Sequence, residues 1–142
     1  MDDGYDLQRF IDAQEPIYDR VLSELSRGRK SSHWMWFVFP QIAGLGYSPM
    51  ARRYAIHSRA EALAYADHPV LGARLRECTE FVNKAESRTI RQIFGSPDDM
   101  KFRSSMTLFS LCASDPAVFQ TALDKYFDGV GDPLTLAWLR PS

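Results

Sequence analysis

A chain of 142 residues with a net charge of −1 is long enough for one folded domain with a sizeable core. Its 45% hydrophobic and 25% charged residues are ordinary for a globular protein, and so small a charge gives no global attraction to nucleic acid or to an anionic membrane. The longest apolar run, residues 34–40, is far shorter than the ~20 residues of a membrane-spanning helix. The polar start Met1-Asp2-Asp3-Gly4 lacks the pattern of a secretory signal, so we expect a cytoplasmic protein without membrane association.

Helix starts that contain proline recur along the chain and predict a mainly helical fold. A Ser or Asp that can cap a helix stands directly before proline at Ser48-Pro49, Ser96-Pro97, Asp115-Pro116 and Asp132-Pro133. His68-Pro69 marks a weaker start of the same kind, and Ser58 with Glu61 has the spacing of a capping box. We therefore predict a mainly α-helical single domain over residues 1–142, a compact multi-helix bundle in which residues 1–5 are disordered.

In chain order, the first helical unit opens after Asp6 and runs toward Gly28, with a break or kink at Pro16. The segment 32–39 is ambiguous. Its aromatics and Val38 favour a buried strand, but no second strong strand exists to pair with it, and we favour a helix ended by Pro40. Further helices are predicted over residues 49–56, 59–66, 69–84, 89–94, 97–113, 116–127 and 133–139.

The helix predicted at 97–113 differs from the others in its pattern. Its first turns are charged, whereas residues 106–113 are apolar on nearly all sides. A helix that is apolar all round is enclosed by others. We therefore predict that this helix is the central, buried one of the bundle.

The cysteines and histidines show no metal-binding pattern. Cys78 and Cys112 are far apart, and each lies in an apolar helical pattern, which predicts buried, reduced thiols. His33, His57 and His68 are not spaced as metal ligands. We therefore predict neither a metal site nor a cofactor.

The strongest candidate for a functional site is the aromatic segment 30–46. Its apolar part must be buried, so Lys30, His33 and Gln41 lie where a buried wall meets water, the usual setting of a ligand pocket. Trp34 or Trp36 would stack on a ring, Lys30 would hold an anion, and His33 is the best acid–base candidate. The alternative is a core helix whose tryptophans only fill the interior.

The loop after this segment is a second candidate. Gly44 and Gly46 precede the helix start at Ser48, where free N–H groups would attract an anion. The alternative is a tight turn followed by an ordinary serine cap.

A third candidate lies on the helix at 97–113. Asp98, Lys101 and Ser105 share one helical face, with Ser104 beside them, and would supply a carboxylate base, a cation and a hydroxyl. Alternatively, Asp98 stabilises the positive end of the helix, Lys101 pairs with Asp98, and Ser105 bonds its own backbone.

The aromatic motif reads Lys30-Ser31-Ser32-His33-Trp34-Met35-Trp36-Phe37-Val38-Phe39-Pro40-Gln41 and is followed by Gly44-Leu45-Gly46. It resembles the signature of the family named domain of unknown function 1810. Further matches lie at Leu7-Gln8-Arg9-Phe10 with Ala13-Gln14, His68-Pro69 with Leu71-Gly72, Phe94-Gly95, Asp98 with Lys101, and Ser104-Ser105-Met106-Thr107-Leu108-Phe109. The resemblance spans nearly the whole chain and implies a mostly helical single domain, but it implies no activity.

Three functions compete. The favoured hypothesis is a pocket for an anionic, ring-bearing small molecule such as a nucleotide derivative, with hydrolase or transferase chemistry as a further step. Its catalytic candidates are His33 and Asp98, and its ligand-binding candidates are Lys30, Trp34, Trp36, Gln41, Gly44, Gly46, Lys101, Ser104 and Ser105. The alternatives are a non-catalytic protein-interaction module and a single-stranded nucleic-acid binder, and the near-zero charge disfavours the latter. The favoured hypothesis requires the segment 30–46 and the first turns of the helix at 97–113 to meet around a hollow.

Overall fold

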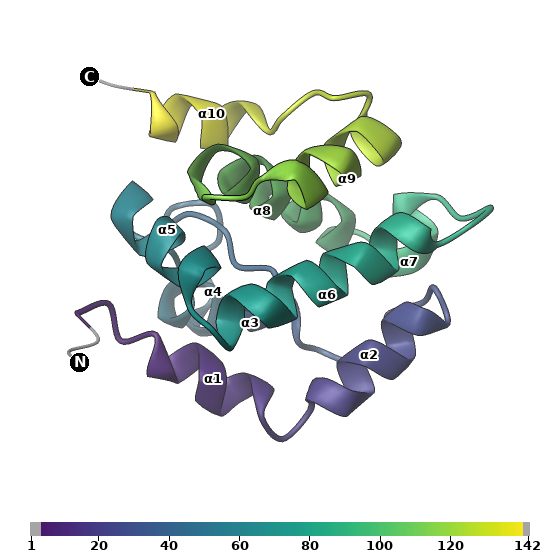
Figure 1. Cartoon of the computed structure of the whole chain (residues 1–142), viewed down its shortest axis with the longest axis horizontal. Coiled ribbons are helices and arrows are strands. Elements are labelled where there is room, and N and C mark those ends of the chain that lie inside the picture. The colour runs from purple at the N-terminus through teal and green to yellow at the C-terminus, as the bar shows by residue number, and fades with distance from the viewer. Residues whose placement is uncertain (1–3, 141–142) are drawn as a thin grey trace.

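The computed structural model describes residues 4–140. This range contains ten α-helices joined by loops, and no strand (Figure 1). They are α1 (Gln8–Gln14), α2 (Tyr18–Ser26), α3 (Met35–Val38), α4 (Pro49–Arg53), α5 (Arg59–Asp67), α6 (Leu71–Lys84), α7 (Ile90–Phe94), α8 (Asp98–Cys112), α9 (Ala117–Phe127) and α10 (Pro133–Leu139). The mainly α-helical fold is thereby confirmed. Of residues 1–5, predicted to be disordered, 1–3 lie outside the described range, and Gly4 and Tyr5 form a turn.

The central helix is α8, and α5, α7, α9 and α10 pack around it. Its charged first turn is partly exposed, whereas every side chain from Ser104 to Phe109 is buried. This burial confirms the central position of the helix. The enclosure predicted for residues 106–113 is wrong beyond Phe109 except at Cys112, because Ser110 and Ala113 are half-buried and Leu111 is 48% exposed. No helix in the described range is long and apolar enough to cross a lipid bilayer.

Pro16 separates α1 from α2, as the sequence predicts. At the end of α1 the buried side-chain amide of Gln14 donates to the carbonyl oxygen of Phe37 at 2.7 Å and to the hydroxyl of Tyr65 at 3.0 Å. The Tyr65 hydroxyl donates to the same Phe37 carbonyl at 3.2 Å. These bonds satisfy a buried amide and hold α3, with its tryptophan-rich motif, against α1 and α5.

Three of the predicted side-chain caps are present. Ser48, Ser58 and Asp132 each accept a hydrogen bond from a backbone N–H in the first turn of the following helix. The Nδ1 atom of His68 accepts hydrogen bonds from two amides at the start of α6, at 3.1 and 3.3 Å. Ser58 forms only half of a capping box, because the Glu61 carboxylate bonds other partners.

The caps predicted at Ser96 and Asp115 are wrong. Pro97 and Pro116 themselves occupy the cap positions of α8 and α9, and neither helix has a side-chain cap. Ser96 and Asp115 therefore stand one residue too early to reach the free amides of the first turn. In α8 two aspartates of that turn stabilise its positive end instead.

The helices α3 and α4 are both shorter than predicted. Ser32, the predicted first residue of this helix, stays outside α3, because its backbone amide and that of Ser31 donate to the Glu24 carboxylate. The α4 helix ends at Arg53 because Ile56 pairs with Ile42 in an isolated parallel bridge, with N···O distances of 2.9 and 3.0 Å. This bridge ties the segment after α3 to the segment after α4.

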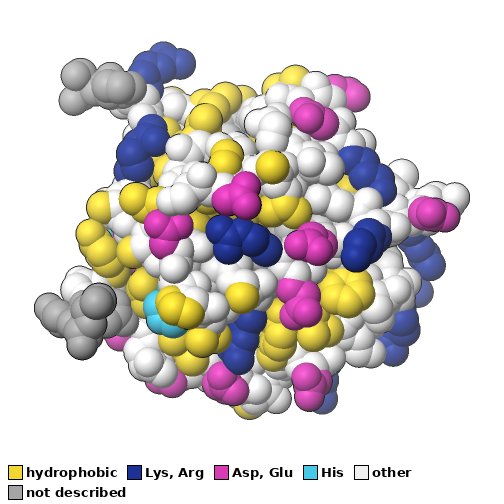
Figure 2. Space-filling model, in the orientation of Figure 1, with side chains coloured by type: hydrophobic (Ala, Val, Ile, Leu, Met, Phe, Trp, Pro, Cys, Tyr) yellow, Lys and Arg dark blue, Asp and Glu magenta, His cyan; other side chains and the backbone are white. Residues whose placement is uncertain are grey.

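Acidic and basic side chains are interspersed on the face of the molecule that Figure 2 shows. This mixture agrees with the net charge of −1. A site for a charged ligand must therefore be sought in a local cluster of side chains.

Candidate functional site

The two stretches predicted to meet do so at Asp98, in the first turn of α8. The Nζ atom of Lys30 lies 2.8 Å from Asp98 Oδ2, and the Nζ atom of Lys101 lies 3.5 Å from Asp98 Oδ1. The Lys30 side chain is 6% exposed and the Lys101 side chain 27%, so the shorter ion pair is also the more buried one. The prediction that segment 30–46 meets this helix is thereby confirmed.

The charges of this cluster do not balance. One carboxylate faces two ammonium groups, so the three side chains carry one uncompensated positive charge. Lys30 is bound to Asp98 at a normal hydrogen-bond distance, whereas 3.5 Å is too long for a strong bond to Lys101. Lys101 is therefore the group with the greater capacity to bind an anion.

Each lysine also lies over an indole ring. Lys30 Nζ is 5.1 Å from the ring centroid of Trp34, and Lys101 Nζ is 5.4 Å from that of Trp36. Trp34 is 1% exposed, so its ring cannot stack on a ligand or on a nucleic-acid base. Trp36 is half-buried and lines the pocket described below, which leaves it as the tryptophan of the motif that a ligand can reach.

A buried carboxylate that the sequence analysis overlooked positions this part of the site. Glu24, 1% exposed, accepts hydrogen bonds from the backbone amides of Ser31 and Ser32, from the Ser32 hydroxyl, and from the Trp34 indole at 2.9 Å. Burial would raise the pKa of Glu24, but the hydrogen bonds from Ser32, Ser31 and Trp34 outweigh it and lower the pKa to about 2. Its place beside Val21 and Leu25 on the apolar stripe of α2 is the signal that could have revealed it.

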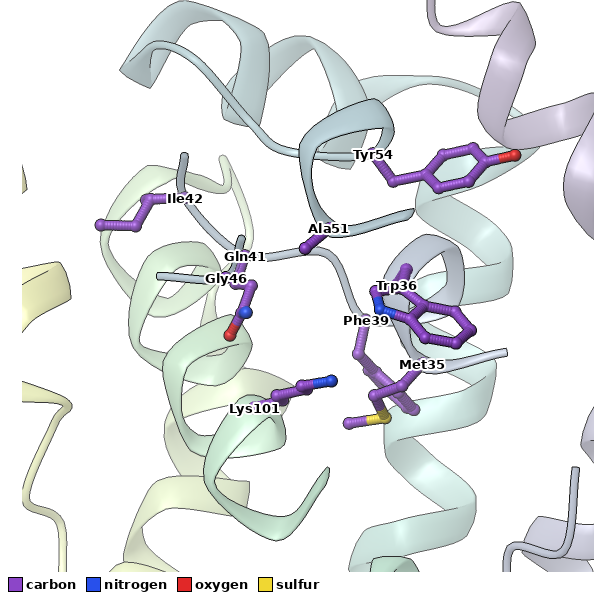
Figure 3. A pocket seen from close by; sticks show the side chains of 9 residues that line it. All are labelled: Met35, Trp36, Phe39, Gln41, Ile42, Gly46, Ala51, Tyr54 and Lys101. Atoms are coloured by element: carbon purple, nitrogen blue, oxygen red, sulfur yellow. The ribbon is translucent and has the colours of Figure 1, made fainter. Parts of the chain in front are cut away.

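A small pocket lies between α3, the segment after it, α4 and α8 (Figure 3). It is lined by Met35, Trp36, Phe39, Gln41, Ile42, Gly46, Ala51, Tyr54 and Lys101. The Gln41 and Lys101 side chains project toward the same space, and the remaining walls are mostly apolar (Figure 3). The cavity measures about 10 Å³, which is room for about one water molecule.

The other predicted site residues do not line this pocket. His33 is exposed, and it has no polar partner among residues 4–140. The Ser104 hydroxyl donates to the Met100 carbonyl at 3.2 Å. The Ser105 hydroxyl is fully buried and lacks a hydrogen-bond partner within the described part of the chain, so the predicted bond to its own backbone is not formed.

The two glycines of the loop after the aromatic segment lie in different surroundings. Gly46 lines the pocket, whereas Gly44 is exposed, with a φ of +96° that favours glycine. The Ser48 hydroxyl caps α4 by accepting from the Ala51 amide at 3.1 Å. Since α4 has only five residues, the alternative of an ordinary serine cap describes this helix start better than an anion site does.

The two cysteines are free and buried, as predicted. Burial raises the pKa of Cys78 to about 12 and also raises the pKa of Cys112. Neither thiol is activated as a nucleophile. No group of three potential metal ligands comes together among residues 4–140.

Comparisons with known proteins agree with this fold. The model of the family described as protein of unknown function (DUF1810) matches residues 4–139. The structure is similar to that of the conserved hypothetical protein Rv1873 from Mycobacterium tuberculosis, with 51% sequence identity, a TM-score of 0.96, and 99% of this chain and 100% of that chain covered. No curated protein matches the sequence. The chain belongs to the DUF1810 family.

Proposed function

We propose that this protein binds a small molecule with one negative charge in the pocket that Gln41 and Lys101 line. The observation that carries the proposal is the unbalanced cluster, in which Asp98 is shared by Lys30 and Lys101. A bound monoanion would complete the charge balance. Because the cluster is partly buried, its electrostatic interaction with a ligand is stronger than it would be in bulk water.

Two polar groups of the pocket are available for such a ligand. The Lys101 ammonium has three N–H donors and one distant carboxylate partner. The half-buried side-chain amide of Gln41 makes no hydrogen bond to another residue of the described range 4–140. Together with apolar walls such as Phe39 and Ile42, these groups suit an anionic head on an apolar body.

The ring-bearing, nucleotide-like ligand expected from the sequence is a more specific form of this proposal. In that form a ring of the ligand stacks on the face of the Trp36 indole that Lys101 does not cover. A phosphate monoester carries up to two negative charges, whereas the cluster offers one positive charge, so a ring with a single carboxylate is the better match.

The geometry supports binding better than catalysis. Asp98 is held between two ammonium groups and acts as their counterion, which does not suit a mobile proton acceptor. His33 is exposed and lies outside the lining of the pocket. Hydrolase or transferase chemistry through His33 and Asp98 is a separate hypothesis, and it requires a ligand that extends from Lys101 to His33.

The test is a melting experiment followed by calorimetric titration with benzoate, inorganic phosphate and adenosine monophosphate. A ligand that binds only the folded protein raises its melting temperature. We expect benzoate to raise it, and we expect the increase to disappear in Lys101→Met. The matched control is Lys84→Met, which removes an exposed lysine at the end of α6. The proposal is wrong if no probe binds, or if both variants lose binding equally.

A further inference from the structure

The pocket is too small for the ligand that its chemistry suits. A cavity of about 10 Å³ accepts one water molecule, whereas even a benzoate ring needs several times that volume. Binding therefore requires one wall of the pocket to move. The walls differ in how firmly the fold holds them.

Most of the pocket is rigid. Lys101 projects from α8, the central helix of the bundle. Phe39 and Met35 are 1% and 2% exposed within the core. Ile42 is 4% exposed, and the parallel bridge fixes its backbone to Ile56.

The segment Gly44–Tyr47 is the wall with the fewest attachments. Its two ends are anchored, because the Ala43 amide donates to the Ile56 carbonyl at 2.9 Å and Ser48 caps α4. Between these anchors, residues 44–47 make no backbone hydrogen bond of normal geometry to any residue in the described range. A segment held in this way opens at a lower free energy than the surrounding helices.

Side-chain contacts of this segment are also few. Tyr47 is 78% exposed, and a Cβ atom placed on Gly44 would lie within 4 Å of no residue of the described range 4–140 other than its chain neighbours. Leu45 is the hydrophobic side chain of this segment that is half-buried against the core. Gly46 is the residue of this segment that lines the pocket. A Cβ atom placed on Gly46 would lie 2.7 Å from the Ala51 Cβ, so the segment and α4 approach as closely as glycine allows.

We propose that Gly44–Tyr47 is a lid, held closed by Leu45 and by the contact between Gly46 and Ala51, and that the monoanionic ligand reaches Lys101 when this lid opens. The inference rests on the proposed function and adds the route by which the ligand reaches the site. Opening the lid removes one half-buried leucine from the core and breaks no strong backbone hydrogen bond. The positive φ of Gly44 places the most permissive residue at the end where the lid must turn.

The first experiment measures opening without a ligand. In Ile42→Cys a thiol is placed at a buried position that lines the pocket, and Tyr47→Cys provides an exposed thiol as the reference for full access. The native Cys78, 0% exposed on α6, reports global unfolding in the same molecule. Mass spectrometry after exposure to a small thiol reagent gives the labelling rate at each position.

We expect position 42 to be labelled at least about tenfold more slowly than position 47 and at least about tenfold faster than Cys78. Adding Leu45→Ala should accelerate labelling at position 42 several-fold, whereas Leu63→Ala, a truncation of an exposed leucine on α5, should not. Equal rates at position 42 and at Cys78 would show that only global unfolding exposes the pocket. That result, or no effect of Leu45→Ala, overturns the lid.

The second experiment closes the lid covalently, with cysteines replacing both Gly46 and Ala51. The Cβ separation of 2.7 Å must relax to the ~3.5–4.5 Å of a disulfide, which is a small shift. We expect the oxidised variant to lose the benzoate titration signal and to regain it after reduction. Equal binding in both states overturns the lid and leaves the proposed function intact. If the wild-type protein binds no probe, the proposed function fails, and the labelling experiment still decides whether the lid opens.

Discussion

Two partly buried charge clusters of this protein differ in how completely their groups are paired. In the first, Arg9 pairs with Glu61 at 2.9 Å, and its guanidinium also donates to four backbone carbonyl oxygens. The second Glu61 oxygen accepts from the His57 amide at 2.8 Å. In the second cluster Lys30 and Lys101 share Asp98, and Lys101 keeps unused donors.

The Arg9 cluster therefore has a structural role, whereas the Asp98 cluster is the candidate for ligand binding. The Arg9 cluster has one positive and one negative charge with its hydrogen bonds filled, so a ligand would have to displace a partner. Both clusters lie beside a hollow, because Arg9 and Glu61 line a second, larger one, but of the two clusters it is the one at Asp98 that has a positive charge in excess. Charge balance, rather than burial alone, indicates which of the two is a candidate site.

Replacement of Arg9 should cause the largest loss in the free energy of unfolding. It would test the structural role of the Arg9 cluster. Arg9→Met leaves Glu61, whose side chain is 4% exposed, as a buried charge without its cation. We expect the free energy of unfolding to fall by about 3–5 kcal/mol, measured by urea denaturation. Arg52→Met, which removes an exposed arginine of α4, is the control and should change it by less than about 0.5 kcal/mol. Similar losses in both variants would contradict the structural role of Arg9.

The second-largest loss in the free energy of unfolding is expected from a substitution of Glu24. The Glu24 carboxylate is buried and accepts four hydrogen bonds. In Glu24→Gln one of its oxygens becomes an NH2 group, which donates hydrogen bonds and cannot accept them. We expect a loss of about 2–3 kcal/mol in the free energy of unfolding. Glu80→Gln, on the exposed face of α6, is the control and should be close to neutral.

The same variant has a defined pH dependence. The pKa of Glu24 is lowered from 4.5 to about 2 in the folded protein, so its carboxylate stabilises the fold fully above pH 4.5. This stabilisation is lost as the pH falls from 4.5 toward 2. The difference in unfolding free energy between wild type and Glu24→Gln should therefore narrow over that range. A constant difference from pH 6 to pH 2 would show that protonation of Glu24 is not linked to folding.

Removal of Lys30 should lower the free energy of unfolding by a smaller amount. It would separate the contribution of Lys30 from that of Lys101 within the Asp98 cluster. Lys30→Met removes the shorter, more buried ion pair but leaves Asp98 with Lys101 as a partner. We expect a loss of about 1–2 kcal/mol in urea denaturation. A loss as large as that of Arg9→Met would mean that the two clusters are equally structural.

Lys101→Met should have the smallest effect on stability, because its ion pair is long and partly exposed. We expect the free energy of unfolding to change by less than about 1 kcal/mol. The same change should abolish benzoate binding, so stability and binding should separate at this residue. If Lys101→Met destabilises the protein more than Lys30→Met does, the assignment of roles within the cluster is reversed.

The fold was largely predictable because its signals are local. The Ser48 and Asp132 caps, the break at Pro16 and the all-round apolar half of α8 each depend on residues within a few positions of one another. The errors also have a local cause. At Ser96 and Asp115 the following proline takes the cap position, which the order of residues alone does not reveal.

The candidate site was less predictable because its contacts join distant parts of the chain. Lys30, Lys101 and Asp98 could be named from their residue types, but only the packing of α8 decides which lysine is paired more tightly. Trp34 and Trp36 look equivalent in the motif, yet the bond from Trp34 to Glu24 buries one indole and leaves the other at the pocket. Periodicity gives no measure of cavity volume, so the narrowness of the pocket could not be predicted.

The unusual acidity of Glu24 has a consequence for measurements on the neighbouring site. A carboxyl whose pKa is about 2 keeps its charge throughout the neutral and mildly acidic range, so its bonds to Ser31, Ser32 and Trp34 persist there. The hydrogen bonds around Glu24, which hold the segment that follows Lys30, therefore do not change with pH near neutrality. Any variation of affinity between pH 6 and pH 8 would then report ionisation of the ligand or of another group of the protein, and not a rearrangement of the hydrogen bonds that Glu24 accepts.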